Sequence, residues 1–427
     1  MKKILLFSFV LTLFAVTVFS QSIKFEDYFI EKSLRIDLLH AGNSESSYFY
    51  LDNLKQEPFW GGSKKNLLDK FDYGEYRVIV KDKSSGRNIY SRGYSTLFQE
   101  WASSPEAKTV SRSFFETITV PYPKNPVNIE IYGRSKKTDF EKVFEFEVNP
   151  DSYFISPELS KKYPWKKIID NGPVSEKVDI VFLADGYTET EMVKFRADAD
   201  RMVGYFFSNS PFKENKDKFN FWIVESPSAE SGTDFPKDKI YKNTIINSSF
   251  STFDVDRYLM TYDIKTVRDL AANVPYDQII ILVNSNVYGG GGVYNYYSIT
   301  SVDDSFSDFV LVHEFGHGFG CLADEYYTSD VAVEDYYDLS VEPYEPNITT
   351  LVNFDKKWKS MLENGTPVPT PQTPDYKNKI GVFEGGGYVA KGVFRPYMDC
   401  TMKSRIRDGF CPVCRKALTE MIEFYSK

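Results

Sequence analysis

The segment Phe306–Tyr326 reads FSDFVLVHEFGHGFGCLADEY. Within it, His313 and His317 flank Glu314 in the pattern H-E-x-x-H, a zinc-binding signature. On a helix, residues four apart lie on the same face, so both imidazoles could reach one ion. Glu314 would lie close by without being a ligand, where it could take a proton from water held by the metal. The pattern therefore predicts a zinc-binding helix.

The alternative is an ordinary helix that happens to carry two histidines. The chain has only three His in 427 residues, and two of them fall inside this five-residue pattern. Apolar residues on either side, Phe309, Val310, Val312 and Phe319, would supply the buried face of such a helix. A helix without a metal would gain little from paired histidines on a face otherwise rich in Gly and Phe. The zinc interpretation is favoured.

The third ligand cannot follow the usual pattern H-E-x-x-H-x-x-G-x-x-H. Gly320 stands where that pattern has its glycine, and Gly tolerates the positive φ needed to turn the chain back. The position of the third histidine is taken by Ala323, and the remaining histidine, His40, lies far upstream. A carboxylate is needed, and Asp324 is preferred over Glu325 because it is nearer the expected position. The alternative for Asp324 is a solvated or Tyr-bonded acid at the end of the helix.

Outward from this helix, residues 172–427 predict an α/β catalytic domain with a mixed, twisted sheet. Short apolar runs predict buried strands, and a segment beginning at Thr188, with Glu191 three residues on, predicts a capped helix. These segments are Val178–Leu183, Thr188–Ser208, Phe219–Val224 and Gln278–Asn284. Residues 330–390 are rich in Pro, Tyr, Asp and Gly without periodicity, and predict a long surface excursion.

The N-terminal part has a different pattern. Residues 21–150 lack a long amphipathic helix and contain short alternating or aromatic runs separated by turns, which favours an all-β sandwich. The strand candidates are Tyr48–Leu51, Tyr76–Lys81, Phe114–Val120, Val127–Tyr132 and Val143–Val148. Residues 151–171 are interpreted as a linker or interface segment.

The first twenty residues predict a secretory signal peptide. Lys2 and Lys3 precede an almost wholly apolar run, and small residues lie before a cleavage site near Gln21. An uncleaved anchor is the alternative, although the run is short for a membrane span. No other segment is long and apolar enough to cross a bilayer, so the mature protein is expected to be exported, whether secreted, periplasmic or on the cell surface.

The overall charge argues against nucleic acid as a partner. The formal net charge is -9, from 51 basic and 60 acidic residues, and no long basic run is present. Mild acidity is best explained by solubility. Neither the charge nor the composition sets an oligomeric state.

The four cysteines lie in the last quarter of the chain. In an exported protein, Cys321, Cys400, Cys411 and Cys414 permit one or two disulfides. Cys411-Pro-Val-Cys414 also has the spacing of a redox or zinc-knuckle motif, but a structural zinc site would need a second matched pair, and Cys321 and Cys400 are far apart in the sequence. The prediction is a structural role, as a disulfide or buried thiols.

Several segments, in this order, resemble the IgA peptidase family of metzincin-like zinc metallopeptidases. They are VDIVFLADGYTETEM (178–192), VNSNVYGGGGVYN (283–295), HEFGHGFGCLADEY (313–326), MDCTM (398–402) and FCPVC (410–414). The resemblance covers roughly residues 165–427, and residues 21–150 look like the β-sandwich that precedes the catalytic domain in relatives. H-E-x-x-H alone is moderately specific, whereas the ordered set is strong.

The resemblance implies further roles near the cleft. Met402 looks like the methionine of a Met-turn beneath the zinc ligands, with Met398 or simple core packing as alternatives. Tyr288–Ser298 would be an edge strand to which a peptide could add by main-chain pairing. Its glycines, Gly289–Gly292, would form a flap or allow close backbone approach. Tyr397 could donate a hydrogen bond to the tetrahedral intermediate, with packing as the favoured alternative.

Together these observations predict a secreted zinc-dependent endopeptidase acting on protein or peptide substrates. Zn²⁺ would be held by His313, His317 and Asp324, with Glu314 as the base that activates the zinc-bound water. Two alternatives remain open: a surface binding protein on a silent metallopeptidase scaffold, and a zinc amidase acting on cell-wall peptides. Nothing in the chain singles out immunoglobulin as a substrate.

Overall fold

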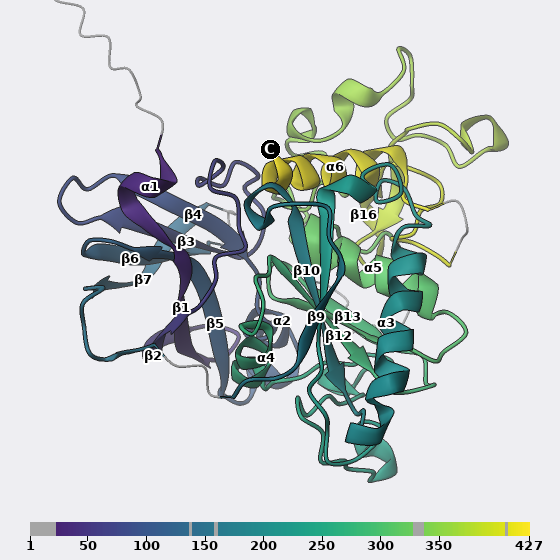
Figure 1. Cartoon of the computed structure of the whole chain (residues 1–427). Coiled ribbons are helices and arrows are strands. Elements are labelled where there is room, and N and C mark those ends of the chain that lie inside the picture. Colours follow the sequence, from purple (N-terminus) through teal and green to yellow (C-terminus); the bar gives the residue numbers. More distant parts are fainter. Residues whose placement is uncertain (1–22, 136–138, 158–160, 328–336, 406–408) are drawn as a thin grey trace, which may run out of the picture.

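The computed structural model describes residues 23–135, 139–157, 161–327, 337–405 and 409–427, which form two parts lying side by side (Figure 1). The predicted signal peptide, residues 1–20, lies outside the described residues. Among the described helices, none combines the length and apolar character that a membrane crossing requires.

The N-terminal part contains two four-stranded sheets. One has the strand order β5-β1-β2-β8 and the other β4-β3-β6-β7, and all pairs are antiparallel except β2–β8. The strands are β1 (Phe29–Gly42), β2 (Ser47–Glu57), β3 (Tyr76–Asp82), β4 (Asn88–Tyr94), β5 (Arg112–Pro123), β6 (Val127–Arg134), β7 (Phe140–Val148) and β8 (Ile155–Ser156). A single apolar cluster takes side chains from both sheets, and the short helix α1 (Phe25–Tyr28) precedes β1.

All five strands expected in this part are present, and in β3 every second side chain is buried, as alternation in a strand requires. The strands β1 and β4 were not predicted. In β1, both faces are covered, and the charged Arg35 and Asp37 are themselves buried as an ion pair at 2.6 Å. Charged residues that are buried as an ion pair cannot be told from exposed ones in a sequence, so the sequence of β1 shows no alternation of buried and exposed positions.

The C-terminal part is built on a six-stranded mixed sheet with the order β13-β14-β12-β10-β11-β9. The four central strands run parallel, and the edge strands β13 and β9 are antiparallel to their neighbours. The strands are β9 (Trp165–Ile169), β10 (Val178–Asp185), β11 (Phe219–Val224), β12 (Gln278–Val283), β13 (Gly290–Val293) and β14 (Tyr297–Ser301). A separate hairpin pairs β15 (Phe383–Gly386) with β16 (Val389–Arg395).

Helices cover both faces of this sheet. Ile180 and Phe182 of β10 pack into a cluster with α3 (Met192–Phe206), α5 (Ser307–Gly320) and α6 (Pro412–Ser426). Val181 and Leu183, which point the other way, pack into a second cluster with α4 (Ile264–Ala271) and α2 (Leu97–Ala102). Because α2 belongs to the N-terminal part, the two parts share a core.

The predicted helix at Thr188 is present, and it begins with the predicted capping box. Glu191 accepts a hydrogen bond from the backbone N–H of Thr188 at 2.8 Å, within a short 3-10 turn that leads into α3.

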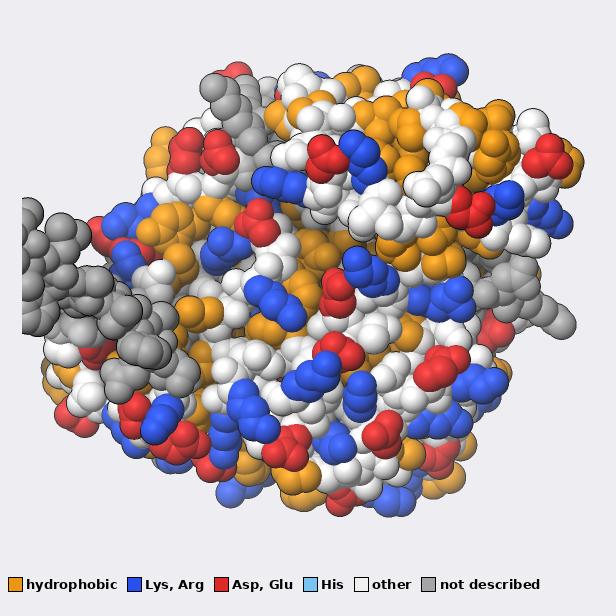
Figure 2. Space-filling model, turned by 90° about the horizontal axis from the view of Figure 1, so that it is seen from above, with side chains coloured by type: hydrophobic (Ala, Val, Ile, Leu, Met, Phe, Trp, Pro, Cys, Tyr) orange, Lys and Arg blue, Asp and Glu red, His pale blue; other side chains and the backbone are white. Residues whose placement is uncertain are grey.

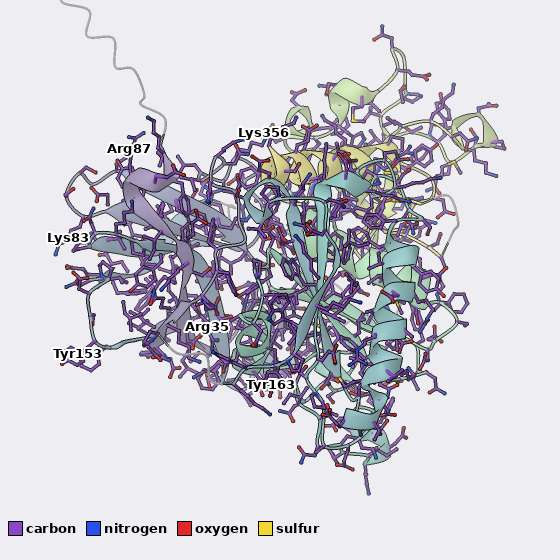
Figure 3. The ribbon with its side chains drawn as sticks, viewed as in Figure 1. Arg35, Lys83, Arg87, Tyr153, Tyr163 and Lys356 are labelled. Atoms are coloured by element: carbon purple, nitrogen blue, oxygen red, sulfur yellow. The ribbon has the colours of Figure 1, made fainter. Side chains whose placement is uncertain are left out.

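Polar contacts also join the two parts. Arg35, labelled near the junction of the two parts in Figure 3, donates a hydrogen bond to Asp269 of α4 at 2.6 Å. The segment 151–171, predicted as a linker, supplies a strand to each part: β8 pairs with β2 and β9 with β11.

The long segment predicted as a surface excursion is only partly on the surface. Within its described residues, Ile348, Trp358 and Val382 are buried. The prediction failed there because isolated apolar residues in an irregular segment have no period that would reveal burial.

Candidate metal centre

Helix α5 brings the two predicted imidazoles together. The Nε2 atoms of His313 and His317 lie 3.2 Å apart, and their ring centroids 4.8 Å apart. Each Nδ1 faces a backbone carbonyl: that of Thr401 at 3.0 Å for His313 and that of Leu322 at 2.5 Å for His317. A ring that donates from Nδ1 keeps the lone pair of Nε2 free, so both rings present an electron pair to the same point.

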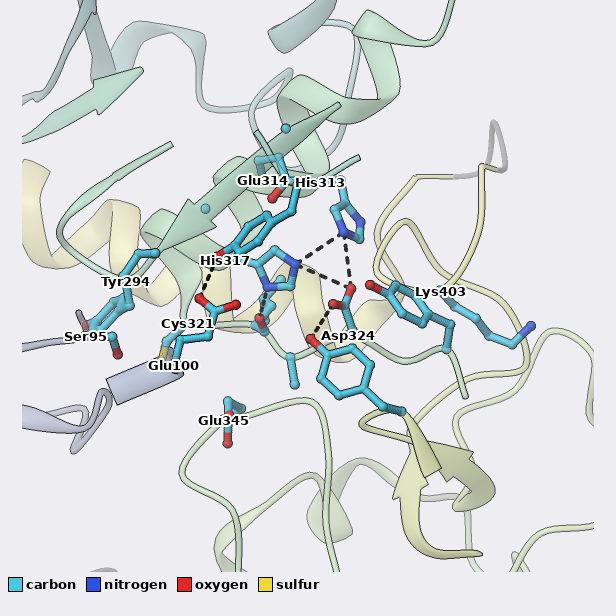
Figure 4. A pocket seen from close by; sticks show the side chains of 18 of the residues that line it. Ser95, Glu100, Tyr294, His313, Glu314, His317, Cys321, Asp324, Glu345 and Lys403 are labelled. Carbon is cyan, nitrogen blue, oxygen red and sulfur yellow. Dashed lines mark hydrogen bonds and ion pairs between the residues drawn. The ribbon is translucent and has the colours of Figure 1, made fainter. Parts of the chain in front are cut away.

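Asp324 completes a triangle with the imidazoles. Its Oδ1 lies 3.2 Å from Nε2 of His313 and 3.4 Å from Nε2 of His317 (Figure 4). This oxygen is buried and accepts no hydrogen bond from the described residues, whereas Oδ2 accepts one from the Tyr388 hydroxyl at 2.8 Å. Burial alone would raise the pKa of Asp324, but the two imidazoles in their protonated form, His317 above all, hold it well below its ordinary value. The group can therefore supply two nitrogen ligands and one anionic oxygen ligand to a metal.

The turn after α5 differs from the prediction in one detail. The residue with positive φ is Cys321, at 51°, and not Gly320, which is the last helical residue. A residue in the left-handed conformation commonly lies just past the end of a helix. Here that residue comes one position later than the sequence pattern suggested. Gly320 is needed for another reason: a Cβ there would lie 2.7 Å from Leu418 Cδ2 of α6.

Beyond this turn, Asn347 fixes the returning chain. Its side chain accepts a hydrogen bond from the backbone N–H of Ala323 and donates one to the Ala323 carbonyl, both at 2.8 Å. The next residue, Asp324, then reaches the imidazoles, whereas Glu325 points to a different cluster with Cys414. His40 lies apart from the site, in β1, where it is buried against Glu116 at 2.7 Å.

Glu314 lies beside the imidazoles and lines the same cavity. Burial raises its pKa above the ordinary value, and the neighbouring imidazoles counteract part of that rise. The edge strand β13 passes very close to it: a Cβ on Gly292 would lie 2.2 Å from the Glu314 carbonyl oxygen, and one on Gly290 3.0 Å from Glu314 Cγ. The consecutive glycines thus allow close backbone approach, one of the two roles expected for them.

Beneath the helix, Met402 is fully buried. A Cβ on Gly316 of α5 would lie 2.8 Å from the Met402 sulfur, and the Met402 carbonyl accepts a hydrogen bond from the Glu325 N–H at 2.7 Å. Tyr397 packs against the main core and is not among the described residues that line the cavity. Its packing alternative is the one the contacts favour.

The cavity that contains these groups has a volume of about 450 Å³ and is lined by both parts of the molecule. From the N-terminal part come Ser95 and Glu100, seen opposite the imidazoles in Figure 4. Burial raises the pKa of Glu100 to about 7, and its carboxylate accepts a hydrogen bond from Tyr258 at 2.5 Å. No local pattern marks these residues, because the contact between the two parts joins segments that are distant in the sequence.

Five tyrosines that line the cavity were also missed: Tyr258, Tyr326, Tyr337, Tyr344 and Tyr388. Only Tyr326 had a signal, since it ends the Asp-Glu-Tyr segment after the helix. On the face seen in Figure 2, acidic and basic side chains are interspersed.

Comparison with known protein families defines the class. A model described as IgA Peptidase M64 matches residues 167–377 and 372–422, and one described as Peptidase M64 N-terminus matches residues 24–145. A comparison with curated proteins finds no match. The protein is a metallopeptidase, a hydrolase acting on peptide bonds, as the sequence predicted. The chain belongs to the IgA Peptidase M64 family, and the predicted family is confirmed.

Proposed function

We propose that this metallopeptidase is a secreted zinc endopeptidase in which His313, His317 and Asp324 hold Zn²⁺ and Glu314 is the catalytic base. The observation that carries the proposal is the triangle of ligand atoms, with sides of 3.2, 3.2 and 3.4 Å. Ligand atoms about 2.1 Å from a tetrahedral zinc ion lie about 3.4 Å from one another, so the donors fit this metal.

The buried Oδ1 of Asp324 supports the same conclusion. An ionised oxygen that is removed from water without a hydrogen bond is costly, and a cation at the centre of the triangle would offset that cost. Tyr388 orients the carboxylate through its other oxygen, and backbone carbonyls orient the two imidazoles.

The bound zinc ion would supply Lewis acidity, which polarises a peptide carbonyl and makes water acidic near neutral pH. The chain supplies the proton transfers. Glu314 takes the proton of the attacking water on its carboxylate and delivers it to the leaving amine. Its raised pKa suits both steps, because the carboxyl must hold the proton between them.

An extended substrate would lie along β13. This strand is the edge of the sheet next to α5, and Gly292 and Val293 line the cavity. At Gly290 the outer edge already accepts a hydrogen bond from the Leu259 N–H at 3.2 Å. Main-chain pairing with a peptide would therefore use the later residues of the strand.

The fold and location belong to the same proposal. A metzincin-like catalytic domain is supported by the position of Met402 beneath α5, and a β-sandwich by the shared core of the two N-terminal sheets. Export is supported by the charged and apolar character of residues 1–20.

The test compares Glu314→Gln with His317→Ala on a library of fluorogenic peptides. Glu314→Gln should keep the metal and lose about 10²–10⁴ in kcat, the usual contribution of a positioned acid–base group. His317→Ala should lose both zinc and activity. Full proteolysis by the Glu314→Gln protein would refute the mechanism. Cleavage of cell-wall peptides without cleavage of proteins would instead support an amidase.

A further inference from the structure

A second cluster of potential metal ligands lies directly behind the first. Glu325, Cys400, Cys411 and Cys414 are all buried, and each offers a ligand atom within 4.8 Å of the others. The four cysteines are buried free thiols, which confirms one of the two structural roles predicted for them. The motif Cys411-Pro-Val-Cys414 has no second matched pair in the sequence, but the fold brings Glu325 and Cys400 to it from separate segments.

The distances suit a tetrahedral metal site. Cys400 Sγ lies 3.8 Å from Cys414 Sγ, and Cys414 Sγ lies 3.3 Å from Glu325 Oε1. Sulfur atoms about 2.3 Å from a tetrahedral zinc ion lie about 3.8 Å apart, and a sulfur and a carboxylate oxygen about 3.6 Å apart. All four cysteines of the chain are free, so the three thiols of the cluster are open to a metal.

The start of α6 favours thiolate ligands. Cys411 is the N-cap residue of α6, and Cys414 lies in the first turn, where the unpaired N–H groups of a helix stabilise a thiolate. The backbone N–H of Cys411 points at Cys400 Sγ at 3.2 Å, as N–H groups do around sulfur ligands.

One oxygen of the Glu325 carboxylate also lacks a partner. Glu325 Oε1 accepts a hydrogen bond from Asn347 at 3.0 Å, but the buried Oε2 has none among the described residues. A fully buried carboxylate beside three thiols is costly unless a cation joins them. This is the independent observation that separates the cluster from an ordinary group of buried cysteines.

We propose that Glu325, Cys400, Cys411 and Cys414 bind a structural zinc ion, distinct from the metal at the histidines. The ion would join three segments: the chain that returns after α5, the loop before Met402, and the start of α6. No open coordination position is needed, as expected for a structural site.

This second ion would position the first site. Glu325 follows Asp324 directly, and Thr401, whose carbonyl orients His313, follows Cys400 directly. A metal that fixes Glu325 and Cys400 therefore fixes the backbone on both sides of the catalytic ligands. The ligands of one site are adjacent in sequence to groups that set the geometry of the other.

The test is the metal content of the full-length purified protein, measured by elemental analysis together with protein concentration. The wild type should hold two zinc ions per chain, one for each cluster. His313→Ala/His317→Ala should retain one, and Cys411→Ser/Cys414→Ser should also retain one. The matched control is Cys321→Ser, which removes a buried thiol outside the cluster and should retain two.

Cobalt and thiol measurements keep the test decisive if the double cysteine variant does not fold. Cobalt(II) bound to the His313→Ala/His317→Ala protein should give a sulfur-to-cobalt charge-transfer band in the near ultraviolet. Alkylation of the denatured wild type without reductant should find four thiols. Two thiols and one zinc ion per chain would mean a disulfide and would overturn the proposal. Retention of two zinc ions by the His313→Ala/His317→Ala protein would refute only the catalytic ligands, whereas retention of two by the Cys411→Ser/Cys414→Ser protein would overturn the proposal.

Discussion

Replacing Tyr388 by Phe tests how the carboxylate ligand is held. The Tyr388 hydroxyl donates a hydrogen bond of 2.8 Å to Oδ2 of Asp324. Burial, together with the charge of Asp324, raises the pKa of Tyr388 far above its ordinary value, so the hydroxyl keeps its proton and remains a donor. A buried hydrogen bond to a charged group contributes about 1.5–3 kcal/mol. That range corresponds to about 10- to 100-fold in a binding constant, which is also the usual effect of losing a group that orients a metal ligand.

The expected result is therefore a 10- to 100-fold weaker affinity for zinc, measured by competition with a chromogenic chelator. At saturating zinc, kcat/KM should recover most of the wild-type value, because the ligand itself remains. Tyr132→Phe is the matched control. It removes a similar bond, from Tyr132 to Glu130 at 2.9 Å, in the N-terminal part, and should leave zinc affinity unchanged. Wild-type zinc affinity in Tyr388→Phe would refute this account of Asp324.

Three further predictions concern the chain around the site. Gly292→Ala would place a Cβ 2.2 Å from the Glu314 carbonyl oxygen, so we expect the free energy of unfolding to fall by about 1–3 kcal/mol and peptidase activity to be reduced. The control is Gly204→Ala, where a Cβ meets nothing within 4 Å, and this change should not destabilise the protein. Asn347→Ala would leave the buried N–H and C=O of Ala323 without their partner, which should lower the thermal unfolding temperature and cost about 2 kcal/mol or more in chemical denaturation; an unchanged midpoint would contradict this. Burial raises the pKa of Glu57 from 4.5 to about 7. As the pH rises, the Glu57 carboxyl therefore loses its proton in the unfolded state before it does so in the folded state. The free energy of unfolding should fall between about pH 4.5 and pH 7, by at most about 3 kcal/mol. Glu57→Gln should remove that part of the slope in denaturation curves measured across this range, and an unaltered slope would refute the assignment.

The shared core of the two parts also has a functional meaning. Helix α2 of the N-terminal part packs against the catalytic sheet, and Glu100 at its centre reaches the cavity. The N-terminal part therefore forms one side of the cavity, in addition to being a separate pair of sheets. The sequence could not reveal this, since neither the contact nor the burial of Glu100 follows from local spacing.

The features that depend on local periodicity could be predicted from the sequence. The four-residue spacing of His313 and His317 puts both rings on one face of α5 whatever surrounds the helix, and continuous apolar runs mark β10, β11 and β12 as buried strands. The same local logic placed Glu314 beside the imidazoles.

Tertiary structure alone decided which carboxylate meets the imidazoles and what the cysteines do. Asp324 and Glu325 are adjacent and chemically alike. The left-handed turn at Cys321 and the hydrogen bonds of Asn347 to Ala323 determine that Asp324, and not Glu325, faces the imidazoles. Cys400 likewise meets Cys414 only because α6 packs against α5. Such contacts depend on how separate elements pack, and no spacing along the chain encodes them.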